Sequence, residues 1–156
     1  MSIQHMISSP VGKIGIRLNH HTLTHLEFLP NTSARAQSNH PLIETIANEL
    51  IAYFKNPKHR FTLQIELQGT PFQKRVWQAL QEIPSGETMT YGSLAKQLKT
   101  GPRAIGQACR TNRLPIIIPC HRIIAHNHMG GFAGNIKGPF AKIKQSLLQH
   151  ERDPSS

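Results

Sequence analysis

The period of the hydrophobic pattern changes at Thr70, and this change constrains the fold more than any other feature of the sequence. Before Thr70, apolar and polar residues alternate over short stretches, which is typical of β-strands with one buried face. After Thr70, apolar residues recur every three to four positions, as on one face of an α-helix. The pattern predicts an α/β (α+β) chain with a small strand-rich N-terminal domain, residues 1–68, and a helical C-terminal domain, residues 69–156.

The N-terminal part contains signals for short strands and one helix. Alternating segments at residues 3–7, 14–18 and 23–28 are separated by turn-forming residues, which predicts three consecutive strands. A fourth alternating segment, residues 61–67, predicts one more strand. Between them, residues 41–54 have helical spacing. The expected buried face of this helix consists of Leu42, Ile43, Ile46, Leu50 and Phe54.

Short helices with a tight connection are predicted in the C-terminal part. Thr70 and Thr90 can each cap a helix, and a further helix is expected over residues 103–110, after the turn at 100–102. Helices joined by such a turn in a basic chain form a helix-turn-helix pattern, which favours DNA binding. An ordinary helical hairpin is the alternative for this segment. The last helix is expected to begin at residues 138–139.

Basic residues greatly outnumber acidic ones. The 156 residues include 18 Lys and Arg against 8 Asp and Glu, which gives a net charge of +10. Such a surplus favours a polyanionic partner, with DNA or RNA ahead of a membrane. No apolar stretch is long enough to span a bilayer, and the N-terminus lacks a secretory signal pattern. We therefore expect a cytoplasmic protein.

The two cysteines, Cys109 and Cys120, lack the spacing of a disulfide framework or a zinc site, so free thiols and no metal are expected. Cys120 lies in the stretch PIIIPCHRII, residues 115–124, directly before His121. A thiol reacts as its thiolate, and a neighbouring imidazole can remove the proton. The alternative for Cys120 is a buried, inert thiol, since free cysteine is among the most buried residue types. Cys109 fits that alternative well.

The isoleucines that flank Cys120 predict strand-like segments on both sides of it. Adjacent residues of an extended strand point to opposite faces, so His121 is not expected to contact the sulfur directly unless the backbone turns here. A water relay from Cys120 to His121 would solve this, with an acid behind the imidazole to orient the ring. Glu82, Glu87 and Glu151 are the candidates for that acid.

Four stretches resemble one known family, in the right order along the chain. They are GTPFQKRVWQALQEIPSGETMTYGSLA (69–95), RAIGQACRTNRLPIIIPCHRII (103–124), GGFAGN (130–135) and LLQHE (147–151). These stretches are similar to motifs of the O6-alkylguanine-DNA alkyltransferases, the methylated-DNA–protein-cysteine methyltransferases. Residues 1–68 resemble the family only in length and in SPVGKIGI. The resemblance implies a ribonuclease-H-like N-terminal domain and a winged helix-turn-helix in the C-terminal domain.

The resemblance also implies an activity. The alkyl group of O6-alkylguanine, and of O4-alkylthymine, in duplex DNA would be transferred to Cys120 after the base is flipped into the site. An S-alkyl cysteine is a stable thioether, so each chain would react once and need no cofactor. The partner would be double-stranded DNA with alkylated bases, and the protein would be a monomer that does not associate with membranes.

Five residues would carry the chemistry if the resemblance holds. Cys120 would be the nucleophile, His121 the general base acting through a water, and Glu151 the acid that polarises His121. Asn112 matches a hinge asparagine that ties the helix-turn-helix to the active-site segment. Tyr91 matches a tyrosine that helps to turn out the target nucleotide and assists at the base.

The resemblance assigns DNA contacts to the helix that begins near Arg103. Arg103 would enter the base stack in place of the flipped base, and this helix would dock in the minor groove. Small residues would allow a close approach to the groove. The implied groove-binding residues besides Arg103 are Ala104, Gly106 and Arg110. The implied pocket wall consists of Gly131, Phe132, Ala133, Gly134 and backbone groups near Ile123.

The chain departs from the family pattern in several places. The connection before Arg103 is about two residues shorter than usual, and Pro102 stands directly before the arginine. Phe132 replaces a common tyrosine, Asn135 a common glycine and Ser85 a bulkier residue. None of these departures removes a catalytic group.

Three other functions are compatible with parts of the pattern. The first is a protein that binds lesions without repairing them. Such relatives lack the acceptor cysteine, so the presence of Cys120 argues against this function. A methylation-responsive DNA-binding regulator could use the same helix-turn-helix. A cysteine hydrolase could use a Cys–His pair, but the basic surplus argues against it.

Overall fold

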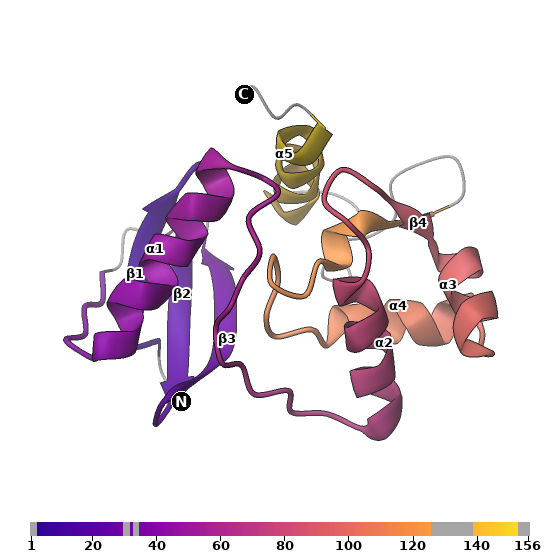
Figure 1. The fold of residues 1–156 in the computed structure, drawn as a ribbon, viewed down its shortest axis with the longest axis horizontal. Helices are drawn as coiled ribbons and strands as arrows, with labels where there is room; N and C mark the ends of the chain where they lie inside the picture. Colours follow the sequence, from indigo (N-terminus) through magenta and orange to yellow (C-terminus); the bar gives the residue numbers. More distant parts are fainter. Residues whose placement is uncertain (1–2, 30–31, 33–34, 126–138, 153–156) are drawn as a thin grey trace. The chain divides into compact units, whose positions relative to one another are not determined.

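The computed structural model describes residues 3–29, 32, 35–125 and 139–152, and every structural statement below concerns these residues. The chain divides into two compact units, Met1–Leu67 and Gln68–Ser156 (Figure 1). The first unit contains the three-stranded sheet and one helix, and the second contains the other helices. The mixed α/β fold class predicted from the sequence is confirmed.

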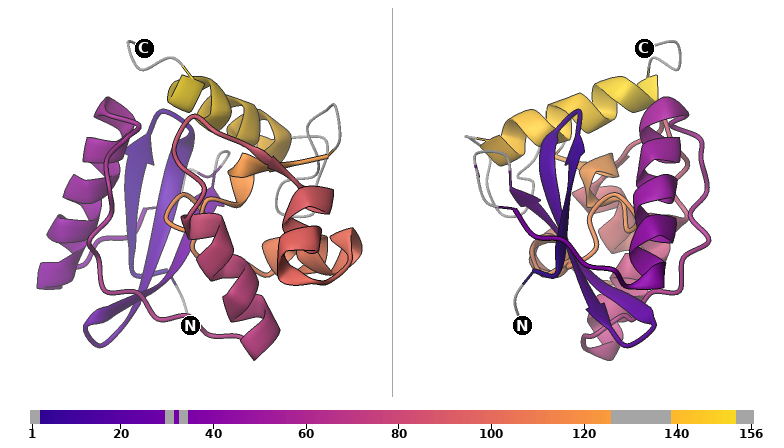
Figure 2. Two further views of the ribbon diagram at one scale, coloured as in Figure 1. Left: turned by 45° about the vertical axis from the view of Figure 1, so that its right-hand side comes forward. Right: turned by 90° about the vertical axis from the view of Figure 1, so that its left-hand side faces the viewer.

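The first unit is an antiparallel meander with one helix. Strands β1 (His5–Ser9), β2 (Gly12–Asn19) and β3 (Thr22–Leu29) pair in sequence order. The three predicted strands are thus confirmed, and α1 (Pro41–Lys55) packs on the sheet beside β1 (Figure 2). Alternation places Ile14, Ile16 and Leu26 in the core.

The predicted buried face of α1 is partly wrong. Leu42 and Phe54 are only half-buried, and Tyr53 is buried at 1 % exposure in place of Phe54. The buried residues are Ile43, Ile46, Leu50 and Tyr53. This set follows the three-and-four spacing of a single stripe, whereas Leu42 lies outside that stripe.

The predicted fourth strand, residues 61–67, does not form. Its backbone pairs with β3 only at one isolated bridge between Leu23 and Ile65, flanked by two hydrogen bonds of 3.1 Å. The alternation of half-buried and exposed side chains is nevertheless present from Phe61 to Ile65. An alternating pattern shows which side chains face the core. It does not show whether the backbone forms a continuous row of hydrogen bonds with a neighbouring strand.

The second unit is built mainly from helices. They are α2 (Pro71–Gln81), α3 (Tyr91–Leu98), α4 (Pro102–Arg110) and α5 (Pro139–Arg152). Strands β4 (Met89–Thr90) and β5 (Ile123–Ile124) form one short parallel pair, and η1 (Cys120–Arg122) is a 3-10 turn. Among the described helices, none is both long and apolar enough to cross a membrane.

Local capping explains where α2 and α3 begin. The Thr70 hydroxyl accepts from the Gln73 amide, and the Gln73 side chain accepts from the Thr70 amide, which completes a capping box. Thr90 accepts from the Ser93 amide at the start of α3. Both N-caps were predicted from the sequence and are confirmed. The last predicted helix begins at Pro139, also as expected.

Helices α2, α3 and α4 pack around a common core. The Trp77 indole donates to the Ala108 carbonyl at 2.9 Å, which joins α2 to α4. The Arg75 guanidinium donates to the Leu98 carbonyl at 2.9 Å and so satisfies the C-terminal end of α3. The core side chains of these helices include Val76, Leu80, Leu94, Ile105 and Ala108. This packing fixes the chain that follows α4.

Candidate active site

The segment between α4 and η1 is a folded turn, not the strand that its isoleucines predicted. Asn112 holds it from both ends: its side-chain oxygen accepts from the Leu114 amide at 2.9 Å, and its side-chain nitrogen donates to the Ile118 carbonyl at 2.8 Å. A further bond of 2.8 Å runs from the Ile118 amide to the Leu114 carbonyl. Ile116 adopts a φ of 74°, which is rare for a β-branched residue and strained. The isoleucines are buried as core side chains of this turn.

Pro119 sets the backbone that presents Cys120. Its φ of −80° and ψ of 67° are those of an inverse γ-turn, and the Cys120 amide donates to the Ile118 carbonyl at 2.8 Å. The proline ring fixes this φ in advance. The chain then continues as the 3-10 turn η1, which the Ile123 amide closes by donating to the Cys120 carbonyl. Cys120 and His121 therefore do not lie on an extended strand, and the premise of opposite faces was wrong.

His121 is oriented by a buried acid. Its Nε2 lies 2.7 Å from the Glu151 carboxylate on α5, and the His121 side chain is 0 % exposed. Glu82 and Glu87, the other candidates from the sequence, are exposed. The structure thus selects Glu151, thirty residues from its partner.

Arg122 completes this cluster as a partner of Glu151, a role that was not predicted from the sequence. It donates to both oxygens of Glu151, at 2.8 and 3.0 Å, and to the Ile83 carbonyl at 2.6 Å. A two-pronged arginine contact fixes the plane of a carboxylate. Arg122 therefore determines how Glu151 faces His121. Its position directly after His121 was the only signal available.

The other imidazole nitrogen, Nδ1 of His121, is buried and has no hydrogen-bond partner among the described residues. Because the Glu151 carboxylate accepts from Nε2, the network assigns the proton of the neutral ring to Nε2 and a lone pair to Nδ1. Burial lowers the pKa of His121, and Glu151 only partly opposes this. The arrangement is a neutral imidazole with a free basic nitrogen inside the protein.

Cys120 is buried, with 5 % of the residue exposed. Burial raises its pKa to about 11, while a hydrogen bond from Asn112 and the charge of Lys144 act in the opposite direction. The thiol is therefore protonated at neutral pH, and a base must take its proton before it can attack. Cys109 is also a buried free thiol, and burial raises its pKa as well.

Three of the four expected DNA-contact residues share one side of α4. Arg103, Gly106 and Arg110 follow the spacing of one helix face, and both arginines are exposed. Nothing lies within 4 Å of a side chain added at Gly106, so this face is open. Ile105, Ala108 and Cys109 point into the core instead. Ala104 is half-buried.

The remaining expected site residues are Tyr91, Ile123 and the pocket wall, and the structure describes only the first two. Tyr91 is the first residue of α3 and is half-buried, and burial raises its pKa. Ile123 is buried and pairs with Met89. The expected pocket wall, Gly131, Phe132, Ala133 and Gly134, lies outside the described residues, as does Asn135.

Lys144 is a site residue that sequence reasoning missed. It is buried on α5 and donates to the Ile123 carbonyl at 2.7 Å. The signal for it was weak: a lysine at a position of the apolar stripe that contains Ile143, Leu147 and Leu148. Within the described part of the chain, no group of three or more His, Cys, Asp or Glu could hold a metal ion.

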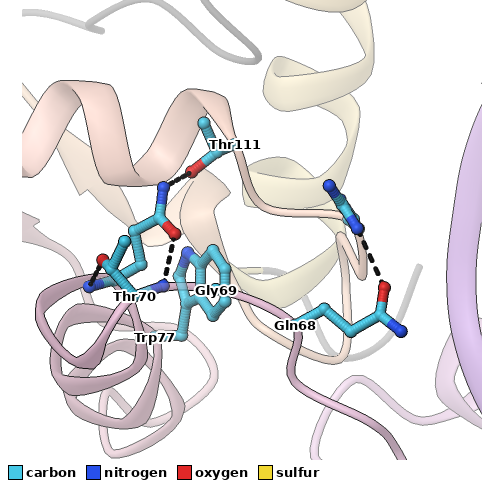
Figure 3. Close-up of a pocket in the computed structure, with 7 residues that line it drawn as sticks. Gln68, Gly69, Thr70, Trp77 and Thr111 are labelled. Atoms are coloured by element: carbon cyan, nitrogen blue, oxygen red, sulfur yellow. Dashed lines mark hydrogen bonds between the residues drawn. The ribbon is translucent and has the colours of Figure 1, made fainter.

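A separate hollow of about 440 Å³ lies at the start of α2 (Figure 3). Its polar residues bond to one another: Gln73 donates to the Thr111 hydroxyl at 3.2 Å, and Arg113 donates to Gln68 at 3.0 Å. Neither Cys120 nor His121 lines it. The hollow is therefore not the site of the thiol chemistry.

Comparison with known proteins identifies the family. Residues 71–153 match the family described as 6-O-methylguanine DNA methyltransferase, DNA binding domain. A methylated-DNA–protein-cysteine methyltransferase of Methanosarcina mazei is 38 % identical over 96 % of this chain and 96 % of its own length. The chain belongs to the methylated-DNA–protein-cysteine methyltransferase family. The curated relatives are named as an enzyme, and the chain is an enzyme of the same class.

Solved structures of methylated-DNA–protein-cysteine methyltransferase relatives agree with this assignment. A crystal structure of Mycobacterium tuberculosis OGT in complex with DNA has a TM-score of 0.79 and 35 % identity, covering 94 % of this chain and 91 % of that one. The O6-methylguanine DNA methyltransferase of Methanococcus jannaschii has a TM-score of 0.66 and 28 % identity, with 97 % and 92 % coverage. The resemblance inferred from the sequence is confirmed.

Replacing Gly86 by alanine is expected to lower the free energy of unfolding of the second unit of this protein by about 1–2 kcal/mol. Gly86 has a φ of 88°, and a Cβ there would lie 3.2 Å from the Glu151 carbonyl oxygen. Urea unfolding followed by the fluorescence of Trp77, the chain's one tryptophan, measures the effect. Gly92→Ala is the matched control, because nothing lies within 4 Å of its added Cβ on α3. Equal stability of the two variants would contradict the expectation.

The stability of the second unit is expected to fall as the pH drops below about 6.5. His121 is held neutral because burial lowers its pKa, whereas the unfolded chain takes up the proton. The unfolded state therefore gains protons first, and the free energy of unfolding decreases toward acid by at most about 1.4 kcal/mol per pH unit. Unfolding of His121→Gln should depend less on pH. A control, His20→Asn at an exposed turn, should keep the wild-type slope.

Proposed function

We propose that this protein repairs alkylated DNA by transferring the alkyl group of O6-alkylguanine in duplex DNA to Cys120. The observation that supports this proposal most is the buried Cys120 thiol, followed at once by an imidazole that Glu151 orients and whose Nδ1 has no partner among the described residues. A relative with 35 % identity was crystallised in complex with DNA. The net charge of +10 suits a nucleic-acid partner.

The proposed step moves one proton and one alkyl group. The Cys120 thiol gives its proton, through a water, to Nδ1 of His121, and Glu151 stabilises the imidazolium that forms. The sulfur then forms a bond to the alkyl carbon while the bond from that carbon to O6 of guanine breaks. The electron pair of the broken bond stays on the base, which takes up the proton that left the thiol and becomes guanine. We propose that Tyr91 assists this protonation at the base.

The product sets the stoichiometry. The sulfur ends as an S-alkyl thioether, which has no good leaving group, so the reaction stops after one transfer per chain. No redox change or cofactor enters this balance, because the thiol and the alkylated base supply every atom. O4-alkylthymine offers the same kind of alkyl–oxygen bond and is proposed as a second substrate.

The buried thiol also requires the base to leave the helix. A base inside a duplex cannot reach the sulfur of a buried residue such as Cys120, so the nucleotide must be extruded into the protein. We propose that Arg103 fills the gap in the stack and that the open face of α4, with Gly106 and Arg110, and the half-buried Ala104 beside it lie against the minor groove. Asn112 then keeps the active-site turn attached to the end of α4. Backbone groups near Ile123, together with Gly131, Phe132, Ala133 and Gly134, are proposed to surround the base.

The two units are proposed to divide the work, with residues 1–68 as a scaffold and residues 69–156 as the alkyltransferase domain. We further propose that the protein acts as a monomer in the cytoplasm.

A single-turnover assay tests the proposed function. Protein is mixed with an excess of duplex DNA that contains O6-methylguanine, and peptides are analysed by mass spectrometry. We expect one methyl group per chain, on the Cys120 peptide, and an equal amount of restored guanine. Methyl on another residue, free methanol, or repeated turnover would contradict the proposal. Binding to the methylated duplex without any transfer would instead indicate a lesion-binding or methylation-responsive regulator.

A further inference from the structure

The hollow at the start of α2 is a cavity of about 440 Å³ that the proposed transfer step does not use. Three parts of the second unit line it: residues 68–70, the first two turns of α2 and the residues that follow α4 (Figure 3). Trp77 is the buried part of this lining, at 3 % exposure, whereas Gln68 and Arg113 are exposed. The hollow therefore has an apolar base and a polar rim that a ligand can reach from solvent.

Close packing fixes the hollow to α4. A Cβ added at Gly69 would lie 2.6 Å from the side-chain oxygen of Gln73 and 2.6 Å from the Trp77 indole, so only glycine fits here. Gln73 donates to the Thr111 hydroxyl, and Trp77 donates to the Ala108 carbonyl. The two bonds join α2 to the C-terminal end of α4, so the hollow has a set position beside that helix.

Arg113 is the charged group of the lining. Its Nη1 donates to the side-chain oxygen of Gln68 at 3.0 Å, and among the described residues Arg113 has no ion-pair partner. A guanidinium carries several N–H donors in one plane, which suits the oxygens of a phosphate. Most of the donors of Arg113 are therefore left for a ligand.

Thr70 supplies a second donor on the rim. Its hydroxyl oxygen accepts from the Gln73 amide, which leaves the hydroxyl hydrogen to donate. The Thr111 hydroxyl, by contrast, already donates to the Ala108 carbonyl at 3.0 Å. Because Pro71 has no N–H and the Gln73 amide is used in the cap, an anion here would bind side chains rather than the first amides of α2.

The surroundings of the hollow are positively charged. Among the described residues, none that lines it is acidic. The only acidic residues from position 68 to 113 are Glu82 and Glu87, and Glu82 lies at the far end of α2, as its C-cap. Lys74 and Arg110 are exposed and adjoin lining residues in the sequence. An anion is therefore the ligand that the charges favour.

The hollow adjoins the face of α4 that is proposed to lie against the minor groove. Arg110 is the last residue of α4 and belongs to that face, and Thr111 and Arg113 of the hollow follow it. The minor groove is about 6 Å wide, whereas a helix with its side chains is about 10 Å across. The phosphates on the rims of the groove must therefore pass beside the helix and its ends. A strand that passes Arg110 would meet the hollow next.

We propose that the hollow binds a phosphate of the DNA strand that passes the C-terminal end of α4, with Arg113 and Thr70 as its ligands. The proposal rests on the proposed function and adds to it a contact outside the groove-facing side of α4. The hollow is larger than a phosphate group alone, so a stretch of sugar–phosphate backbone fits it better than a free ion. Such a contact positions the duplex without reading its sequence.

The test counts phosphate contacts from the salt dependence of binding. The affinity of wild type, Arg113→Gln and Arg113→Lys for an unmodified, fluorescently labelled duplex is measured by anisotropy at a series of salt concentrations. We expect Arg113→Gln to bind about tenfold more weakly at about 100 mM salt, and its plot of log Kd against log salt to be shallower by about 0.9. Arg113→Lys keeps the charge and should keep a slope close to that of wild type.

Two control variants separate the charge from the fold. Gln68→Leu removes the hydrogen-bond partner of Arg113 but leaves its charge, and Lys142→Gln removes a charge from an exposed position of α5, which does not line the hollow. Both should keep the wild-type slope. Equal slopes for Arg113→Gln and wild type would overturn the proposal. The same loss of slope in either control would also overturn it, because the effect would then come from packing or from net charge.

A second measurement changes the DNA. A methylphosphonate linkage, which removes the charge of one phosphate, is moved step by step along each strand of a duplex with one O6-methylguanine. Cys120→Ala protein is used, because it leaves the lesion in place. We expect a position where neutralisation weakens binding by about tenfold but has no further effect when Arg113→Gln is also present. Absence of such coupling at every position would overturn the proposal.

The phosphate site and the proposed function can fail separately. The salt series uses unmodified DNA and requires no transfer. If wild type failed to methylate Cys120, the proposed function would fail whatever the salt slopes showed. If wild type methylated Cys120 while Arg113→Gln kept the wild-type slope, the phosphate site alone would fail.

Discussion

Cys120→Ala is expected to abolish alkyl transfer while the protein continues to bind methylated duplex DNA. The proposed reaction ends with the alkyl group on this sulfur, and alanine offers no nucleophile. The transfer rate should fall by more than about 10³-fold. The fold should be retained, because a small buried side chain is replaced by a slightly smaller one. A mass assay for methyl on protein and a gel-shift assay with the same duplex measure the two properties.

Cys109→Ala is the matched control for this change. Cys109 is 6 % exposed, close to the 5 % of Cys120, so both substitutions remove one buried thiol. Cys109 lies in α4 and lacks the adjacent imidazole. We expect Cys109→Ala to transfer the alkyl group at close to the wild-type rate. Methyl transfer that persists in Cys120→Ala but is lost in Cys109→Ala would assign the acceptor to the other thiol.

Glu151→Gln is expected to lower both activity and stability. The carboxylate accepts from His121 and from two nitrogens of Arg122 while only 1 % of its side chain is exposed. Removing the charge of Glu151 leaves the Arg122 guanidinium without its negatively charged partner inside the protein, which lowers the free energy of unfolding by about 3 kcal/mol. The imidazolium that forms during transfer also loses its counter-charge, so the rate should fall by about 10²-fold. Urea unfolding and single-turnover rates measure the two effects.

Glu82→Gln makes the same chemical change at an exposed position, the C-cap of α2. It should leave the rate and the unfolding free energy close to wild type. If Glu151→Gln matched Glu82→Gln in rate but not in stability, Glu151 would be a structural residue alone. That outcome would contradict its proposed role behind His121.

The helix starts were predictable because their causes are local. Thr70 and Gln73 lie three residues apart, and Thr90 caps the helix that begins beside it. Alternation also located β1, β2 and β3, because a hairpin brings neighbouring segments together at little entropic cost. The alternating pattern predicted a strand at residues 61–67 that does not form, because this segment pairs with β3 at a single bridge to Leu23. Pairing between distant segments depends on the rest of the fold.

The site was less predictable because distant residues determine it. Local preference predicted strand around Ile116, but the Asn112 side chain bonds the turn at both ends, and Ile116 has a positive φ within that turn. The Cys120–His121 pair was visible in the sequence. Glu151 was one of three acids until the resemblance singled it out, and the fold now places it against His121. Lys144 carried no signal beyond its place in an apolar stripe, since its partner is a backbone carbonyl.

The spacing of two residues on helix α5 determines which parts of the active site they contact. The polar contacts that Lys144 and Glu151 make with η1 and β5 depend on the seven-residue interval between these two residues. One residue inserted within that interval would rotate Glu151 by about 100° around the helix axis and shift it by about 1.5 Å, away from His121 and Arg122. An insertion before Pro139 leaves the interval unchanged. Changes in the length of the chain that leads into α5 should therefore be tolerated better than insertions or deletions between Lys144 and Glu151.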